Sequence, residues 1–270
     1  MKLRHTHALI ALLLLAMGAG TALALSTRTT QTAQTAASDA LKKGQPTKVV
    51  NCTRINRPYD IDISCGLNVT YTPVDQTPVV IVTAPEALLP HVAVTQSSNS
   101  LTITLTKKGS RLRKRERIDV LITGRVPHAI DLNSGSKLRF DKGLQTDGDF
   151  SLEASSGAVA QWDVTLSVKG KFEIESSSGA VIKGKGIEAH HLDIEANSGA
   201  VANLDAISTH SLKADANSGA VIHLSGSSTG KASLEANSGG VIRAQDYHAA
   251  STDVDVDTNS GGTIKLGKRP

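Results

Sequence analysis

Apolar and polar residues alternate one by one through much of the chain after residue 47. Because the side chains of a strand point alternately to its two faces, this period of two predicts half-buried β-strands. Pro and Gly separate the segments, and only Ala87-Leu88-Leu89 is expected to form a helical turn. The strands predicted in the first half cover residues 60–64, 67–71, 79–82, 101–106 and 118–122.

The second half repeats a tripeptide, Asn/Ser-Ser-Gly, every 20 or 22 residues. Apolar or small residues recur five and three positions before each glycine and three positions after it. One such repeat cannot bury its own apolar face, so the pattern predicts stacked coils with a continuous core. Even spacings keep every strand facing the same way. The repeat glycines are Gly135, Gly157, Gly179, Gly199, Gly219, Gly239 and Gly261.

Each repeat glycine is expected at a corner of its coil. Glycine accepts a positive φ without steric cost, and a chain that turns sharply needs one. The Asn or Ser before it can hydrogen-bond nearby backbone, and the small pair should let neighbouring coils approach closely.

An acidic residue lies four positions before every repeat glycine. In stacked coils these side chains would be about 4.8 Å apart, where like charges repel. Two interpretations stay open: a face for cations or a basic partner, and a solvated stripe that prevents unwanted edge pairing. We call this set the acidic ladder; it comprises Asp131, Glu153, Glu175, Glu195, Asp215, Glu235 and Asp257.

The N-terminus has the pattern of an export signal. Lys2 and Arg4 precede an apolar run at residues 8–17, and Ala22-Leu23-Ala24 forms an A-x-A cleavage site. The run is shorter than the roughly 20 residues that span a bilayer. Residues 25–46 are rich in Thr, Ala, Gln and Ser and predict a flexible tether, with a short amphipathic helix as the alternative.

Only two cysteines are present, Cys52 and Cys65. In an oxidising compartment such a pair most simply forms a disulfide, which is the prediction; two unpaired buried thiols are the alternative. Two cysteines without a nearby histidine lack the ligands of a metal site.

Charge is unevenly distributed along the chain. Residues 25–127 carry 14 basic and 7 acidic residues, whereas residues 128–270 carry 13 and 18. The densest basic stretch, residues 107–117, lies between two predicted strands and is expected to be a hairpin loop. It predicts contact with an anionic surface, and a solvated loop is the alternative. Its basic residues are Lys107, Lys108, Arg111, Arg113, Lys114, Arg115 and Arg117.

No catalytic motif of the H-E-x-x-H or P-loop kind occurs in the chain. Five histidines are scattered through the later repeats and do not recur at one repeat position, so no cofactor or metal is predicted. Export and the scarcity of aromatic residues argue against nucleic acid. Trp162, Phe140, Phe150 and Phe172 fall on the early coils and are expected to fill the core or cap its end. The histidines are His190, His191, His210, His223 and His248.

Several of these features together resemble the putative auto-transporter adhesin head, or head GIN domain, family. They are the signal peptide, the strands around Ile61 and Ile63, the 118–122 strand leading to residues 130–135, and the repeated Ser-Gly-Ala-Val units. The resemblance covers about residues 48–266. It implies a right-handed, single-chain β-helix at the cell envelope or surface, with no shared catalytic residues.

The predicted fold is therefore all-β, a right-handed β-solenoid with about seven C-terminal coils of 20–22 residues. Residues 1–24 form the signal peptide, 25–46 the tether, 47–127 an N-terminal strand part, and 128–267 the repeat part of the same domain.

The predicted function is that of a non-catalytic module for binding, adhesion or scaffolding, in the periplasm or on the surface of a Gram-negative-type bacterium. Its expected partners are anionic envelope material, another envelope protein or a neighbouring copy. A β-helical polysaccharide-active enzyme is the alternative, which an aromatic-lined groove with two close, pKa-shifted carboxylates would favour.

Overall fold

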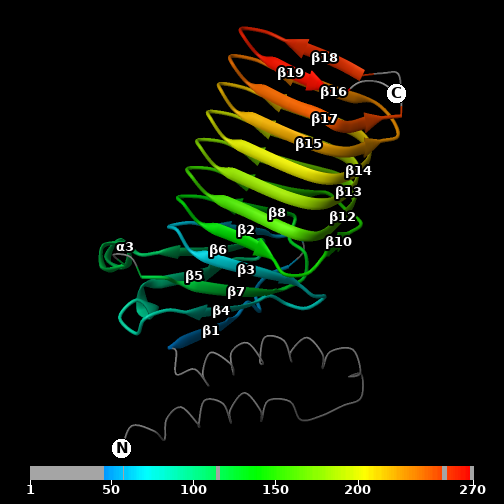
Figure 1. Ribbon diagram of the computed structural model, residues 1–270. Helices are drawn as coiled ribbons and strands as arrows, with labels where there is room; N and C mark the ends of the chain where they lie inside the picture. The colour runs from blue at the N-terminus through cyan, green and yellow to red at the C-terminus, as the bar shows by residue number, and fades with distance from the viewer. Residues whose placement is uncertain (1–45, 57, 114–115, 251–253, 268–270) are drawn as a thin grey trace, which may run out of the picture.

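The computed structural model describes residues 46–56, 58–113, 116–250 and 254–267. It confirms the predicted fold class: 62% of the chain is strand and 4% helix, and the strands build a β-solenoid of about six turns (Figure 1). The coil count is thus close to the seven expected. The predicted signal peptide and residues 25–45 of the predicted tether lie outside the described residues.

Strands of the first half mix parallel and antiparallel pairing. β1, β4 and β7 are antiparallel neighbours, as are β5 and β6. β7 then pairs in parallel with β3, and β6 with β2. A 3-10 turn and one short helix, α3, join the strands. The bounds are β1 Thr47–Asn51, β2 Asp60–Ile63, β3 Asn68–Pro73, β4 Val79–Thr83, η1 Leu89–His91, β5 Val92–Gln96, β6 Ser100–Leu105, α3 Lys107–Leu112 and β7 Asp119–Gly124.

All pairings within the second half are parallel, each strand lying on the corresponding strand of the previous coil. The coils form the inclined stack in Figure 1. The bounds are β8 Ala129–Leu132, β9 Lys137–Phe140, β10 Leu144–Thr146, β11 Phe150–Ala154, β12 Val159–Ser176, β13 Val181–Ala196, β14 Val201–Ala216, β15 Val221–Ser228, β16 Ala232–Ala236, β17 Val241–Ala249, β18 Val254–Thr258 and β19 Thr263–Leu266.

Each coil has three sides. The side that ends at the Ser-Gly corner we call the pre-corner side, and the one that follows the corner the post-corner side. A short third side, begun by β10, closes the coil. β2 and β3 lie on the pre-corner and post-corner sides beneath β8 and β9, so the N-terminal part continues into the stack without a break.

The corner is a tight turn in which two successive residues have positive φ. Ser198 has φ 54° and Gly199 φ 72°, and the amide of Ala200 donates to the carbonyl of Asn197 at 3.1 Å. This is a type I′ turn. The amide of Gly199 also donates to the carbonyl of Ser218 in the next coil at 3.2 Å. The same bond joins successive corners from Gly135 to Gly239, and the amide of Ser238 donates to the carbonyl of Asn259 in the last corner at 3.3 Å. These bonds place the repeat glycines on one edge of the solenoid, as predicted.

The close approach of coils predicted for the small pair does not depend on its glycine. A Cβ atom at any of the seven repeat glycines would meet nothing within 4 Å. Close approach of the coils therefore does not require glycine there, and its positive φ is the reason for its use. Close approach matters instead at Gly184, where a Cβ would lie 2.0 Å from the Trp162 ring.

The core is a set of like-on-like ladders inside the coils. The residues five positions before each corner glycine are at most 2% exposed from Ile61 to Leu234, whereas Val256 on the last coil is 46% exposed. Aromatic rings fill the first coils as predicted, with Phe140 in edge contact with Tyr71 and Trp162.

Candidate functional site

The acidic ladder forms one continuous row on the pre-corner side. Strand register places every member directly on the next, from Asp131 to Asp257. The row also continues to Asp62, which pairs with Asp131 and was not predicted. Residues 62–66 repeat the spacing of an acid four positions before a corner glycine, but Cys65 replaces the serine, which hid the unit. Cys65 and Gly66 have φ 67° and 69°, like the other corners.

In the later coils the acids of the ladder have polar partners within the chain. Asn197 donates from its side chain to Glu195 at 2.6 Å, and Asn237 to Glu235 at 2.5 Å. The corner asparagine therefore serves the neighbouring carboxylate, rather than the backbone as predicted. Asp215 instead pairs with Lys213 at 2.6 Å.

In the earlier part of the ladder, repulsion between the carboxylates is less well compensated. Burial, together with Glu153 and Asp62, raises the pKa of the half-buried Asp131 carboxyl to about 6. Burial, Glu153 and Glu195 likewise raise the pKa of Glu175. Both shifts favour the protonated acid, because a second negative charge on a partly desolvated face is unfavourable. Within the described residues, no three His, Cys, Asp or Glu side chains are placed to hold a metal ion.

The basic stretch does not form the predicted hairpin loop. Residues 107–112 form α3, whose first turn is capped by the Thr106 hydroxyl, which accepts from the amide of Gly109 at 3.1 Å. Figure 1 shows α3 projecting from the margin of the molecule, beside β5 and β6. The side chains of Lys107, Lys108 and Arg111 are exposed on it.

Two further basic residues of the stretch, Arg113 and Arg117, have partners within the chain. Arg113 donates from its guanidinium to the carbonyls of Cys65 at 2.6 Å and Gly66 at 2.5 Å, so it holds the first corner. Arg117 pairs with Asp119 at 2.6 Å. The two remaining predicted residues, Lys114 and Arg115, lie outside the described residues.

The predicted disulfide is absent, and both thiols are unbonded. Cys52 follows β1, which is separated from β3 by β4 and β7, whereas Cys65 lies in the corner between β2 and β3. Three steps of about 4.8 Å between strands exceed the Cα separation that a disulfide permits, below about 7 Å. Burial raises the pKa of the Cys52 thiol to about 11. Burial would also raise the pKa of Cys65, but hydrogen bonds from Thr104, the Leu105 backbone, Ser64 and Ser110 lower it.

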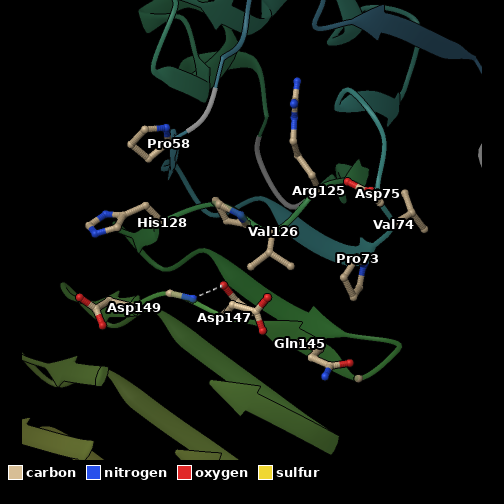
Figure 2. Close-up of a pocket in the computed structure, with 14 residues that line it drawn as sticks. Pro58, Pro73, Val74, Asp75, Arg125, Val126, His128, Gln145, Asp147 and Asp149 are labelled. Atoms are coloured by element: carbon tan, nitrogen blue, oxygen red, sulfur yellow. Dashed lines mark hydrogen bonds between the residues drawn. The ribbon is translucent and has the colours of Figure 1, made fainter. Parts of the chain in front are cut away.

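A pocket of about 740 Å³, which we call the junction pocket, lies where the N-terminal part meets the stack, and no sequence motif predicts it (Figure 2). Its polar groups are mostly engaged within the chain. Asp147 pairs with Lys169 at 2.7 Å, and Asp149 accepts from the amide of Lys171 at 2.8 Å. Figure 2 shows the Arg125 side chain extending away from both aspartates. Both aspartates are therefore already held by groups of the chain itself.

A groove of about 830 Å³ runs along the post-corner side across several coils. Trp162 is its only aromatic residue besides Phe140, and both are at most 4% exposed, so neither offers a platform for a sugar ring. Asp131 and Glu175 line neither this groove nor the junction pocket.

Three histidines of the later repeats, His190, His191 and His210, meet on the surface. The ring centroids of His190 and His210 are 4.9 Å apart in a stacked arrangement, and His191 lies 4.3 Å from His190. Their Nδ1 atoms are engaged by hydroxyls, His191 with Ser211 at 2.6 Å and His210 with Thr229 at 3.1 Å. The cluster is thus part of the surface hydrogen bonding of the coils.

The sequence pattern of one family, described as "Putative auto-transporter adhesin, head GIN domain", matches residues 58–173 and again residues 151–269. Together the two matches cover well over half of the chain. The protein belongs to this family. No curated protein matches the sequence.

Solved structures share the head GIN fold at low identity. A putative adhesin from Bacteroides fragilis is 20% identical with a TM-score of 0.64, over 82% of this chain and 96% of that one. A putative adhesin from Parabacteroides distasonis is 17% identical with a TM-score of 0.58, over 82% and 96%. A putative lipid binding protein from Parabacteroides distasonis is 16% identical with a TM-score of 0.57, over 83% and 96%. Within the described part of this head GIN protein, no helix is long and apolar enough to cross a membrane.

Proposed function

We propose that this head GIN protein is an exported, non-catalytic, adhesin-like module that attaches to anionic envelope material through α3. The observation that carries the proposal is the exposure of Lys107, Lys108 and Arg111 on one projecting helix. Among the described residues, none of the ion pairs involves these three side chains. Their charge is therefore available to a partner outside the chain.

The binding role is favoured over catalysis by where the perturbed carboxylates lie. Asp131 and Glu175 have raised pKa values but belong to a row on a strand face, and they line neither the junction pocket nor the post-corner groove. A glycoside hydrolase needs two carboxyls that flank a bound sugar. A row of stacked acids along a sheet does not offer that arrangement.

Anionic lipid is the partner that we propose for α3. A basic side chain near an anionic membrane surface contributes about 1 kcal/mol, and one structural relative is named a putative lipid binding protein. The acidic ladder begins at Asp62, which accepts from Thr102 on the strand before α3, and it runs up the stack from there. The same membrane would therefore repel the pre-corner side. The protein would then stand on the surface through its N-terminal part, with the stack directed away.

Co-sedimentation with vesicles tests this proposal. The test variant carries Ser at Lys107, Lys108 and Arg111; the matched control carries Ser at Lys137, Lys183 and Lys185, which are exposed on the stack. Arg113 and Arg117 are kept because they have partners within the chain. We expect the α3 variant to lose about a hundredfold in affinity for anionic vesicles, and the control to bind like the wild type.

Binding of the wild type should also weaken as salt shortens the Debye length, and neutral vesicles should bind none of the proteins. Equal losses in both variants would assign the attraction to overall charge rather than to α3. Binding that ignores salt, or no binding by the wild type, would overturn the proposal.

A further inference from the structure

The two ends of the solenoid are finished differently. At the N-terminal end, β2 and β3 are covered by β6 and β7, and these by β5 and β4. At the other end, the last coil consists of β18 and β19, each paired only with the coil below among the described residues. Figure 1 shows these two strands at the far end of the stack. The outer edges of both strands thus present unpaired backbone amides and carbonyls.

Core side chains are also uncovered at this end. Val256 and Leu266 are each 46% exposed, although both continue ladders that are buried in the coils below. Ile264 between them is only half-buried. A terminal repeat that stands alone in water normally carries a polar outer face. This coil instead combines open backbone edges with open apolar ladders.

We propose that the open end binds a second copy of this chain, so that two solenoids pack end to end about a two-fold axis. Such an axis, perpendicular to the stack, reverses the direction in which one coil runs relative to the other. The edge strands of the two copies would therefore pair antiparallel, and backbone amides and carbonyls of both edges would be satisfied. The apolar ladders of the two cores would meet across the interface.

Charge selects one arrangement among those that the symmetry allows. The outward residues of β18 are Asp255 and Asp257, and the outward charged residue of β19 is Lys265. An axis through the middle of β18 would set these acids against the same acids of the partner, which is unfavourable. An axis through the Ser260–Gly261 corner would set β18 of one copy against β19 of the other. Opposite charges would then face each other twice.

The pair that decides this arrangement is Asp257 with Lys265 of the partner subunit. Asp255 is already held by Lys231 at 2.8 Å. Asp257 receives only a 3.4 Å contact from the Asn259 amide, and none of the ion pairs among the described residues involves Lys265. The same charges discourage other pairings of these edges, as charged residues on edge strands generally do. A second copy is therefore the partner that the edge fits.

The test is the oligomeric state of the purified protein by sedimentation velocity over a range of concentrations. We expect a monomer–dimer equilibrium and no larger species, because a two-fold interface closes. Val256→Ser combined with Leu266→Ser should weaken the dimer at least tenfold. The matched control is Val49→Ser, because Val49 is 45% exposed on β1 at the opposite end; it should leave the equilibrium unchanged.

Charge reversal tests the arrangement and stays informative if the apolar variant misfolds. Lys265→Glu alone should weaken the dimer at least tenfold, since two acids then face each other at both contacts. Adding Asp257→Lys to the same chain should restore dimerisation, because each swapped pair is again complementary. Failure of that rescue in a folded protein, a wild type that stays monomeric, or a dimer lost only through Val49→Ser would each overturn the proposal.

Discussion

The N-terminal part and the repeat stack achieve the same burial by different means. In the N-terminal part, single side chains make contacts that occur once: the Tyr59 and Tyr71 hydroxyls both donate to the Arg125 carbonyl, at 2.5 and 2.9 Å. In the stack, one corner and one set of ladders recur in every coil, and neighbouring coils repeat each contact. The difference predicts that a single substitution can remove much of the stability of the N-terminal part. The stability of the repeat stack is expected to be spread in smaller amounts over many equivalent positions.

The largest expected effect is that of Tyr71→Ala in the N-terminal part. Tyr71 is fully buried, contacts Phe140 and donates to two carbonyls. We expect a loss of about 4 kcal/mol in the free energy of unfolding, measured by chemical denaturation. The control is Phe172→Ala in the stack, which removes a fully buried ring without polar bonds. It should cost about 1 kcal/mol less, and a larger cost would contradict the comparison.

An intermediate effect is expected at a corner of the stack. Gly199→Val should lower the free energy of unfolding by about 2 kcal/mol, because a β-branched residue is strained at φ 72°. The space around the position is open, so steric contact adds nothing. Asn203→Val introduces the same side chain on a strand of the same coil. It should lower the free energy of unfolding by less than about 0.5 kcal/mol, which is the usual range for surface substitutions. Equal melting temperatures would show that positive φ does not limit this corner.

The smallest expected effect concerns Asp131 and depends on pH. Its pKa is raised from 3.8 to about 6 in the folded protein, so the folded state binds the proton more tightly than the unfolded chain does. The stabilisation is therefore complete below about pH 4 and is lost as the pH rises through 6. Asp131→Asn should raise the stability at pH 7 by about 1 kcal/mol after allowance for partial exposure, and should change little at pH 4.

Asp215→Asn is the matched control for this titration. It neutralises another acid of the same ladder, but one that pairs with Lys213 at 2.6 Å. We expect it to be neutral or slightly destabilising at pH 7. If thermal melts show the same gain for both variants, the relief would come from the ladder as a whole rather than from Asp131.

The repeat half was largely predictable because its signal recurs. The corner glycines, the acidic ladder and the buried positions all follow from one spacing, and an error at one repeat is corrected by the others. The N-terminal part offered no such redundancy. Its alternation does not predict β1 and β5. It predicts a loop after β6, because the capped first turn of α3 depends on Thr106 rather than on any periodicity.

Contacts between distant segments were the part that the sequence could not supply. Whether Cys52 and Cys65 meet depends on the order β1–β4–β7–β3, which alternation alone does not determine. The junction pocket likewise forms only where the mixed strands of the N-terminal part meet the parallel strands of the stack. The sequence spacing between Asp62 and Gly66 matches that of the other ladder acids and their corner glycines. A repeat motif defined by the acid and the glycine, rather than by the serine between them, would have included Asp62.

The self-contained bonding of each corner has a consequence for how such a protein changes in length over evolution. From Gly135 to Gly239 each corner is joined to the next by the same backbone bond, and the 20 or 22 residues of a coil keep the side chains of each strand facing the same way. A duplication or deletion of one such unit in the coding sequence would thus leave the remaining contacts as they were. It would move the two ends about 4.8 Å further apart or closer together. The stack can therefore serve as an adjustable spacer whose height is set in whole-coil steps.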